Sequence, residues 1–163
     1  MSTDKLRGMT DTKITRFSLK GNNVTAKVVQ VYDGDTCDLV FDYRGELMRY
    51  NCRLKGINTA ELRKKRGKVQ HDAKGRDGNI ARDFLAWLCT GYNAKEFDDK
   101  EHIWTKTELQ KWLNESEELV YAKLGGFGKY GRLLVTLKRT RYARKTFNQL
   151  LLDEKYARKY RGK

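Results

Sequence analysis

The sequence predicts an α+β fold, a small antiparallel β-barrel with helices packed against it. Two observations support this prediction. β-like segments come first, and helical apolar spacing then alternates with further strands towards the C-terminus. Strands that precede helices in this way are typical of α+β proteins. At 163 residues the chain is long enough for one domain with a real core.

Three strands are expected near the start of the domain. Asp33-Gly34 and the segment 42–45 supply turn chemistry between them. In the third strand apolar residues alternate with polar ones, so one face should be buried and Arg53 should stand on the other. The expected ranges are Val24–Tyr32, Thr36–Phe41 and Glu46–Leu54.

Helices and further strands are expected after a basic connector at 62–76, which should be looped. Apolar residues from Ile80 to Leu88 recur at helical spacing, and Gly91 closes that helix. A second helical stretch lies within 92–118, where Thr105 and Glu108 have capping-box spacing. Strands at 119–124 and 133–138 then flank a glycine-rich loop at 125–131.

The last helix should begin near Thr146, which forms a possible capping box with Gln149. Its buried side should extend to Ala157. At the other end of the chain, residues 1–23 are polar and read as a flexible arm ahead of a domain at 24–163. This arm lacks an apolar secretory core, which favours an intracellular protein.

The composition indicates which classes of partner the chain can bind. Its 35 Lys and Arg exceed 21 Asp and Glu, giving a net charge of +14. Such an excess favours polyanions, although ribosomal, chromatin and membrane-surface proteins share it. No apolar stretch is long enough to span a membrane. Cys37, Cys52 and Cys89 form no CxxC pair, so we expect reduced thiols and no zinc site.

Two short motifs support the first hypothesis about the chemistry of the protein. Asp33 and Asp35 flank Gly34 at a strand–turn–strand junction, where clustered carboxylates could hold Ca²⁺. Arg53 and Glu61 lie eight residues apart, and such a pair could hold a phosphate and take a proton from water. In isolation, the first motif reads better as an ordinary hairpin and the second as a surface pair.

The segment "GGFGKYGR" (125–132) carries the second hypothesis. Its glycines satisfy GxGxxG, but the segment leads into a strand rather than a helix, which excludes a dinucleotide-binding turn. It reads as a flexible turn that presents Lys129, Tyr130 and Arg132 to a phosphate. A plain glycine hairpin is the simpler alternative.

Taken together and in order, these motifs resemble the staphylococcal nuclease family. The likeness rests on "DGDT" (33–36), "RLKGINTAE" (53–61) and "KYGR" (129–132), with "GNIARDFL" and "FNQLLLDEKYARKY" similar to family helices. It runs from Val24 to Tyr160. The resemblance implies an OB-fold five-stranded barrel with about three packed helices, and residues 92–118 would be a helical insertion into it.

The resemblance also implies a Ca²⁺ site. Asp35 matches a metal-binding aspartate, Thr59 matches a residue that offers its backbone carbonyl, and Asp33 matches an acid that supports them. Asn58 stands where the family has a second metal-binding aspartate, so the site loses one negative charge. Asp33 or Asp38 could compensate for that loss.

The catalytic residues implied by the resemblance are two arginines and a glutamate. Arg53 and Arg132 would clamp the phosphate, and Glu61 would be the general base. Lys129 and Tyr130 would contact a terminal phosphate of the bound nucleotide. The expected activity is Ca²⁺-dependent hydrolysis of DNA or RNA by a monomer, which leaves 3′-phosphate ends.

Two alternatives stay open. The chain could be a catalytically impaired member of this family that binds nucleic acid, an alternative that Asn58 favours. It could also be an OB-fold protein that binds single strands by aromatic stacking. The acids of the 92–118 insertion make it a poor surface for nucleic acid, so we expect a packing or partner element.

Overall fold

A closed five-stranded β-barrel forms the body of the protein in the computed structural model, which describes residues 3–62, 71–72 and 76–161. The strand order is β1-β2-β3-β6-β5, and β5 returns to β1. The strands are β1 (Asn23–Asp33), β2 (Thr36–Tyr43), β3 (Glu46–Leu54), β5 (Val120–Phe127) and β6 (Leu133–Lys138). The α+β prediction of a five-stranded barrel with helices is confirmed.

One strand pair departs from the expected antiparallel barrel. β3 and β6 run parallel, with Cys52 opposite Leu133 and Leu54 opposite Val135, while the other neighbours are antiparallel. Their parallel pairing requires a long connection between them, and this connection contains the helices. The barrel is therefore mixed.

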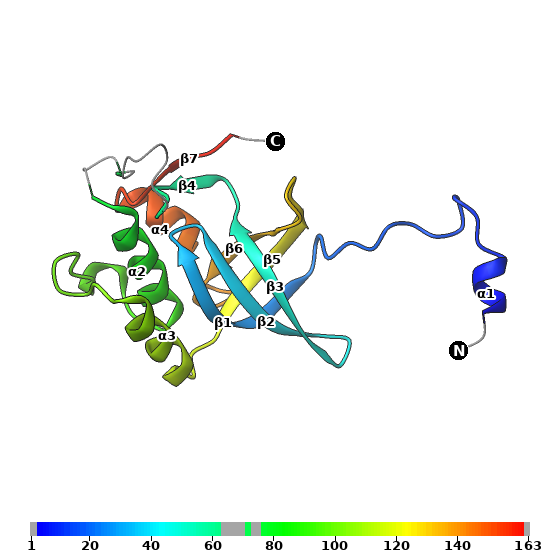
Figure 1. The fold of residues 1–163 in the computed structure, drawn as a ribbon, viewed down its shortest axis with the longest axis horizontal. Coiled ribbons are helices and arrows are strands. Elements are labelled where there is room, and N and C mark those ends of the chain that lie inside the picture. The colour runs from blue at the N-terminus through cyan, green and yellow to red at the C-terminus, as the bar shows by residue number, and fades with distance from the viewer. Residues whose placement is uncertain (1–2, 63–70, 73–75, 162–163) are drawn as a thin grey trace.

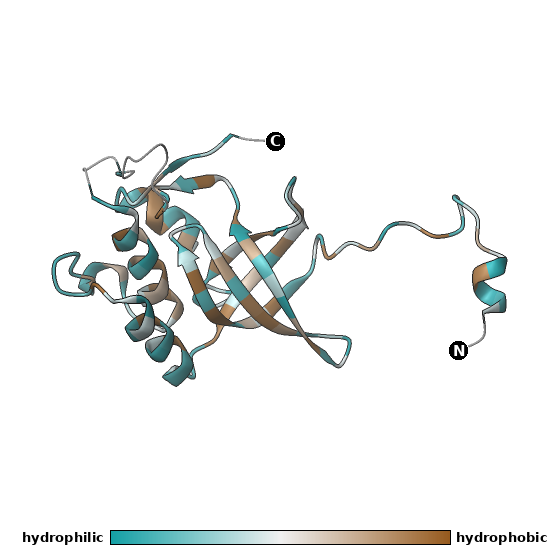
Figure 2. Ribbon diagram, viewed as in Figure 1, coloured by the Kyte–Doolittle hydropathy of each residue, from teal (hydrophilic) through white to brown (hydrophobic). Residues whose placement is uncertain are grey.

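The alternation of apolar and polar residues along the strands places the core inside the barrel. In β6, Leu133, Val135 and Leu137 are buried while the residues between them are partly exposed. Apolar and polar positions alternate along the barrel strands in Figure 2. In β3 the same alternation buries Cys52 and Leu54, as expected.

The three longest helices pack against one side of this barrel (Figure 1). They are α2 (Gly78–Cys89), α3 (Lys106–Glu115) and α4 (Phe147–Asp153), with a short 3-10 turn, η1 (Ala94–Glu96), between the first two. α2 begins at Asp77, whose side chain accepts the Asn79 N–H. Ten of its twelve residues are buried, so α2 is the central helix of this layer.

The insertion is bound to the domain through α2. The capping box of Thr105 and Glu108 is present, and it sets the start of α3. The buried carboxylate of Asp83 accepts the Trp104 N–H at 2.9 Å, and the neighbouring Arg82 donates to the Trp104 carbonyl at 2.6 Å. The packing role expected for the insertion is therefore present.

The C-terminal helix is shorter than expected. α4 ends at Asp153, and Lys155 has a left-handed backbone with φ 64°, which turns the chain away from the helix axis. Ala157 then lies in a short strand, β7 (Ala157–Lys159), that pairs with β4 (Ile57–Thr59). At the helix start, Thr146 accepts the Gln149 N–H, but the Gln149 side chain donates to Asp153.

The N-terminal boundary also differs from the prediction of an arm at 1–23. Leu19 is fully buried, and the Gly21 N–H donates to the Leu124 carbonyl at 3.0 Å. The domain therefore begins near Leu19. The preceding residues extend away from the barrel to α1 (Asp4–Arg7) in Figure 1.

Three further expectations concern the basic connector, membrane-spanning segments and the cysteines. Most of the basic connector, 63–70 and 73–75, lies outside the described residues. Among the described residues, no helix has the length and apolar character needed to cross a bilayer. The three cysteines are buried free thiols, as expected.

Candidate active site

The Asp35 carboxylate is fixed at the turn between β1 and β2. Both of its oxygens accept hydrogen bonds, from the Thr36 hydroxyl at 3.0 Å and from the Thr59 backbone N–H at 2.9 Å. The Asp35 N–H donates in turn to Asp33 at 3.1 Å. Asp35 is only 5% exposed, so the surrounding strands determine its orientation.

Gly34 allows this turn to approach the rest of the fold closely. A Cβ at this position would lie 2.7 Å from the Ala81 Cβ in α2 and 2.8 Å from the Thr59 Cγ2 in β4. Both distances are below 3.0 Å, which is closer than a Cβ atom comes to another heavy atom in folded proteins. The glycine is therefore required by packing, and it holds Asp33 and Asp35 against β4 and α2.

Arg53 connects Asp35 with Asn58. Its Nη1 lies 3.1 Å from Asp35 Oδ2, and its Nη2 donates to Asn58 Oδ1 at 3.2 Å. The Nη1 contact is an ion pair by distance, but this buried nitrogen makes no well-directed hydrogen bond to the described residues. A buried donor without an acceptor is costly, and an anion in the site would supply one.

Sequence reasoning missed the contribution of the C-terminal strand. The pairing of β7 with β4 continues to Tyr160, whose N–H donates to the Gly56 carbonyl at 2.9 Å. The Tyr160 ring lies 5.1 Å from the Arg53 guanidinium, a cation–π distance. Residues 147–160 read as one helix in the sequence, so no sequence signal placed this tyrosine beside Arg53.

Glu61 follows β4 and is exposed to solvent. The backbone that carries it is held by the start of α2. A Cβ on Gly78 would lie 2.4 Å from the Ala60 carbonyl oxygen and 3.1 Å from the Glu61 carbonyl carbon. The close approach that this glycine permits sets the position of Glu61 relative to the barrel.

The turn between β5 and β6 presents the remaining cations. The Gly131 N–H donates to the Gly128 carbonyl, and Gly131 adopts φ 78°. Tyr130 at its tip is 78% exposed, with the Lys129 ammonium 5.8 Å and the Arg132 guanidinium 6.0 Å from its ring centre. The turn therefore presents an exposed aromatic ring between two positively charged side chains.

These elements meet around a cavity of about 680 Å³, hereafter the Asp35 cavity. Eight of the nine predicted site residues line it, and Thr59 is the exception. The eight are Asp33, Asp35, Arg53, Asn58, Glu61, Lys129, Tyr130 and Arg132. Thr59 instead lines a small neighbouring cavity beside His71 and Asp72.

The charge of Asp35 acts on the neighbouring carboxyl group of Asp33. Burial first, and then the negative charge of Asp35, raise the pKa of Asp33 to about 7. Asp33 therefore resists ionisation beside the Asp35 carboxylate. A cation or a proton is the natural partner for such a pair.

Three side chains here carry oxygen atoms of the types that bind hard cations. The carboxylates of Asp33 and Asp35 and the amide oxygen of Asn58 line one cavity, and these are the ligand types that Ca²⁺ accepts. The nearby Thr59 Oγ1 is buried and finds no hydrogen-bond partner in the described part of the chain. Within that part no three His, Cys, Asp or Glu side chains form a metal-binding group.

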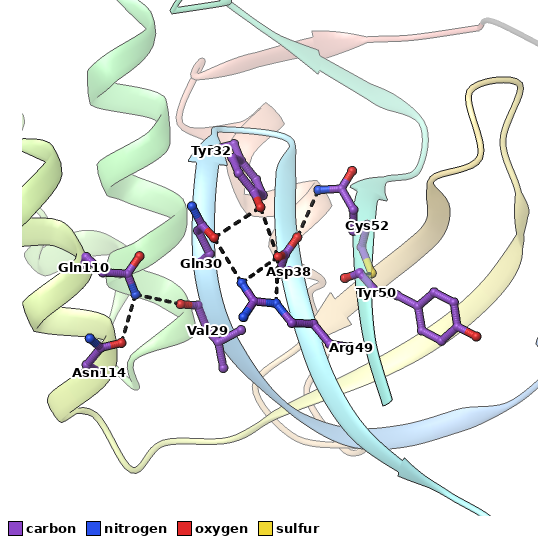
Figure 3. A network of polar contacts seen from close by, with 10 residues as sticks. Val29, Gln30, Tyr32, Asp38, Arg49, Tyr50, Cys52, Gln110 and Asn114 are labelled. Carbon is purple, nitrogen blue, oxygen red and sulfur yellow. Dashed lines mark hydrogen bonds and ion pairs between the residues drawn. The ribbon is translucent and has the colours of Figure 1, made fainter. Parts of the chain in front are cut away.

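Asp38, one of the two acids that could compensate for Asn58, is engaged by other side chains. Its carboxylate accepts from the Tyr32 hydroxyl at 3.0 Å, the Arg49 Nε at 2.9 Å and Asn51 at 3.0 Å (Figure 3). Asp38 does not line the Asp35 cavity. Asp33 is therefore the better candidate.

A comparison of the chain with known proteins finds no matching family model and no match among curated proteins.

Proposed function

We propose that this chain is a nuclease that hydrolyses phosphodiester bonds in DNA, RNA or both, as a monomer and with Ca²⁺ as cofactor. The observation that carries the proposal is the Asp35 cavity, which is lined by two aspartates, two arginines and an exposed glutamate. Its volume of about 680 Å³ suits a nucleotide-sized ligand. The net charge of +14 favours the same polyanionic substrates.

The phosphate would lie between Arg53 and Arg132. Arg53 carries a buried donor without a directed acceptor, and a phosphate oxygen would satisfy it. Both guanidiniums would stabilise the negative charge that grows on the phosphoryl oxygens in the transition state. Lys129 and Tyr130 would contact a further phosphate at the cavity mouth.

Glu61 would act as the general base. It takes a proton from water while the water oxygen bonds to phosphorus and the P–O5′ bond breaks. The leaving 5′ oxygen takes a proton from solvent, so the products are a 3′-phosphate and a 5′-hydroxyl. Asp35, Asn58 and the backbone carbonyl of Thr59 would hold Ca²⁺, with Asp33 beside them, and the ion would supply positive charge for the phosphate.

A nucleic-acid-binding module without catalysis is the second candidate. The contacts of Arg53 favour it, because this residue engages Asp35 and Asn58, the two side chains expected to hold the metal. Such a module would bind DNA or RNA and leave it intact.

The test compares Glu61→Gln with Glu46→Gln, which neutralises an exposed glutamate of the β2–β3 hairpin outside the Asp35 cavity. We expect Glu61→Gln to lower kcat by about 10²- to 10⁴-fold, the usual contribution of a general base. Oligonucleotide binding should change little in either variant. Equal cleavage rates for Glu61→Gln and the unsubstituted protein would exclude this role for Glu61.

A further inference from the structure

A second and larger cavity of about 1230 Å³, hereafter the α3 cavity, adjoins the Asp35 cavity. Asp33, Glu61 and Arg132 line both, so the two cavities meet at the predicted catalytic residues. One wall of the α3 cavity is the outer face of β1, β2 and β3, and the other is α3 of the insertion. A ligand held at Arg132 would therefore border both cavities.

The α3 wall is polar and positively charged. Lys106, Gln110 and Asn114 follow each other at four-residue spacing and share one face of the helix, with Lys111 beside them. The Gln110 amide is held in place, since its Nε2 donates to the Val29 carbonyl at 3.0 Å and to Asn114 Oδ1 at 2.9 Å (Figure 3). The buried residues of the helix, Leu109 and Leu113, lie beside this face and pack in the core.

The acids of the insertion lie mostly away from this wall. Among the Asp and Glu of 92–118, Glu115 alone lines the α3 cavity, 3.9 Å from Lys111. Asp99 is paired with Arg76 at 3.2 Å, and the Glu118 side chain packs beside Gly91. The insertion is acidic in composition, and this composition made it seem a poor surface for nucleic acid. The face of the insertion that borders the site, however, is not acidic.

The barrel wall contributes an aromatic ring. Tyr32 lines the α3 cavity and is 40% exposed, and its hydroxyl is held by Asp38 and by Gln30 at 3.2 Å. Figure 3 shows these polar groups gathered around the hydroxyl, which fixes one end of the side chain. A fixed and partly exposed tyrosine in a cavity that lysines also line is a common platform for an unpaired base.

We propose that the α3 cavity binds the single strand of nucleic acid that continues from the phosphate at the Asp35 cavity. Lys106 and Lys111 meet backbone phosphates, and Tyr32 stacks with a base. This inference rests on the proposed function and adds to it a preference for unpaired polynucleotide over short fragments. It gives the insertion a part in substrate binding.

The test is a matched pair of double variants in the full chain. Lys106→Gln with Lys111→Gln removes two charges from the α3 wall. Lys95→Gln with Lys100→Gln removes two charges from exposed insertion positions that line neither cavity. All four side chains are exposed, and the Lys111–Glu115 pair is long, so both proteins should fold normally.

Binding is measured with chelator present, using single-stranded DNA and RNA of about twelve nucleotides and a dinucleotide control. We expect the α3 variant to bind the longer strands roughly five- to tenfold more weakly, with a salt slope lower by about 1.4 for two lost phosphate contacts. Dinucleotide binding should not change, and the Lys95/Lys100 variant should bind like the unsubstituted protein.

Equal weakening in both double variants, or no weakening in the α3 variant, would overturn the inference. The proposed function is judged separately, by cleavage with metal added. If the unsubstituted protein cleaves and the α3 variant binds the longer strands normally, the inference is refuted and the nuclease proposal stands. A protein that never cleaves but shows the expected binding difference refutes the nuclease proposal and supports the α3 cavity as a binding site.

Discussion

At the scale of single residues, Asp33 gives the site a measurable pH dependence. Its carboxyl has a pKa raised from 3.8 to about 7 by burial and by the Asp35 charge. The folded protein thus binds this proton more tightly than the unfolded chain does. The stability that it contributes is full below about pH 4 and is lost as the pH rises through about 7.

Asp33→Asn should therefore remove this loss of stability. The Asn side chain keeps an oxygen to accept the Asp35 N–H, and it carries no charge to repel Asp35. We expect the variant to be more stable than the unsubstituted protein above pH 7, as measured by urea unfolding at a series of pH values without metal. Asp42→Asn is the control, because Asp42 accepts a similar turn hydrogen bond from Gly45 but is exposed. Parallel pH profiles for Asp33→Asn and the unsubstituted protein would contradict the account.

Asn58 tests the proposed cation site. Its amide oxygen accepts from Arg53, which also contacts Asp35, so a carboxylate at this position would add negative charge next to Asp35. We expect Asn58→Asp to tighten the apparent Ca²⁺ affinity roughly tenfold, since affinity follows the number of charged ligands.

A Ca²⁺ titration of activity or of intrinsic fluorescence measures this change. Asn23→Asp adds the same charge at the exposed start of β1 and should leave the affinity as it is. An unchanged affinity in Asn58→Asp would show that position 58 is not near the cation.

At the scale of elements, the site depends on how closely the β1–β2 turn packs against β4 and α2. Gly34→Ala places a methyl group 2.7 Å from Ala81 and 2.8 Å from Thr59, both of which are buried. Backbone must move to relieve this contact. We expect a loss of about 1–3 kcal/mol in the free energy of unfolding, as is usual for overpacking.

Gly126→Ala is the control for this variant, because a Cβ there meets nothing within 4 Å and the glycine has no left-handed backbone. Urea unfolding of both proteins at one pH gives the comparison. If Gly34→Ala were as stable as Gly126→Ala, packing would not explain the glycine.

Elements with a strong local signal could be predicted from the sequence. The alternation in β3, the capping box of α3 and the spacing of α2 each depend on residues close together in the chain. β4 and β7 were missed because three residues are too few to show a period. Residues 157–160 also continue the helical pattern of α4, so only the left-handed backbone at Lys155 reveals the end of that helix.

At the scale of the whole molecule, eight of the nine residues predicted from the motifs line one cavity, but the motifs did not predict what surrounds it. The ion pair of Arg53 with Asp35 and the ring of Tyr160 arise from strands that meet only in the folded barrel. The same holds for the α3 cavity, which exists because the insertion folds back beside β1. Composition alone suggested that the insertion would avoid nucleic acid, and composition does not show which face carries which charge.

The most direct test of the central claim is a cleavage assay that combines metals with substrates. Plasmid DNA, single-stranded DNA and RNA are incubated with Ca²⁺, Mg²⁺, Mn²⁺ or chelator, and the product ends are identified. The account predicts cleavage that requires Ca²⁺, stops with chelator, and leaves 3′-phosphate and 5′-hydroxyl ends. Retained binding with no cleavage under any of these metals would contradict it.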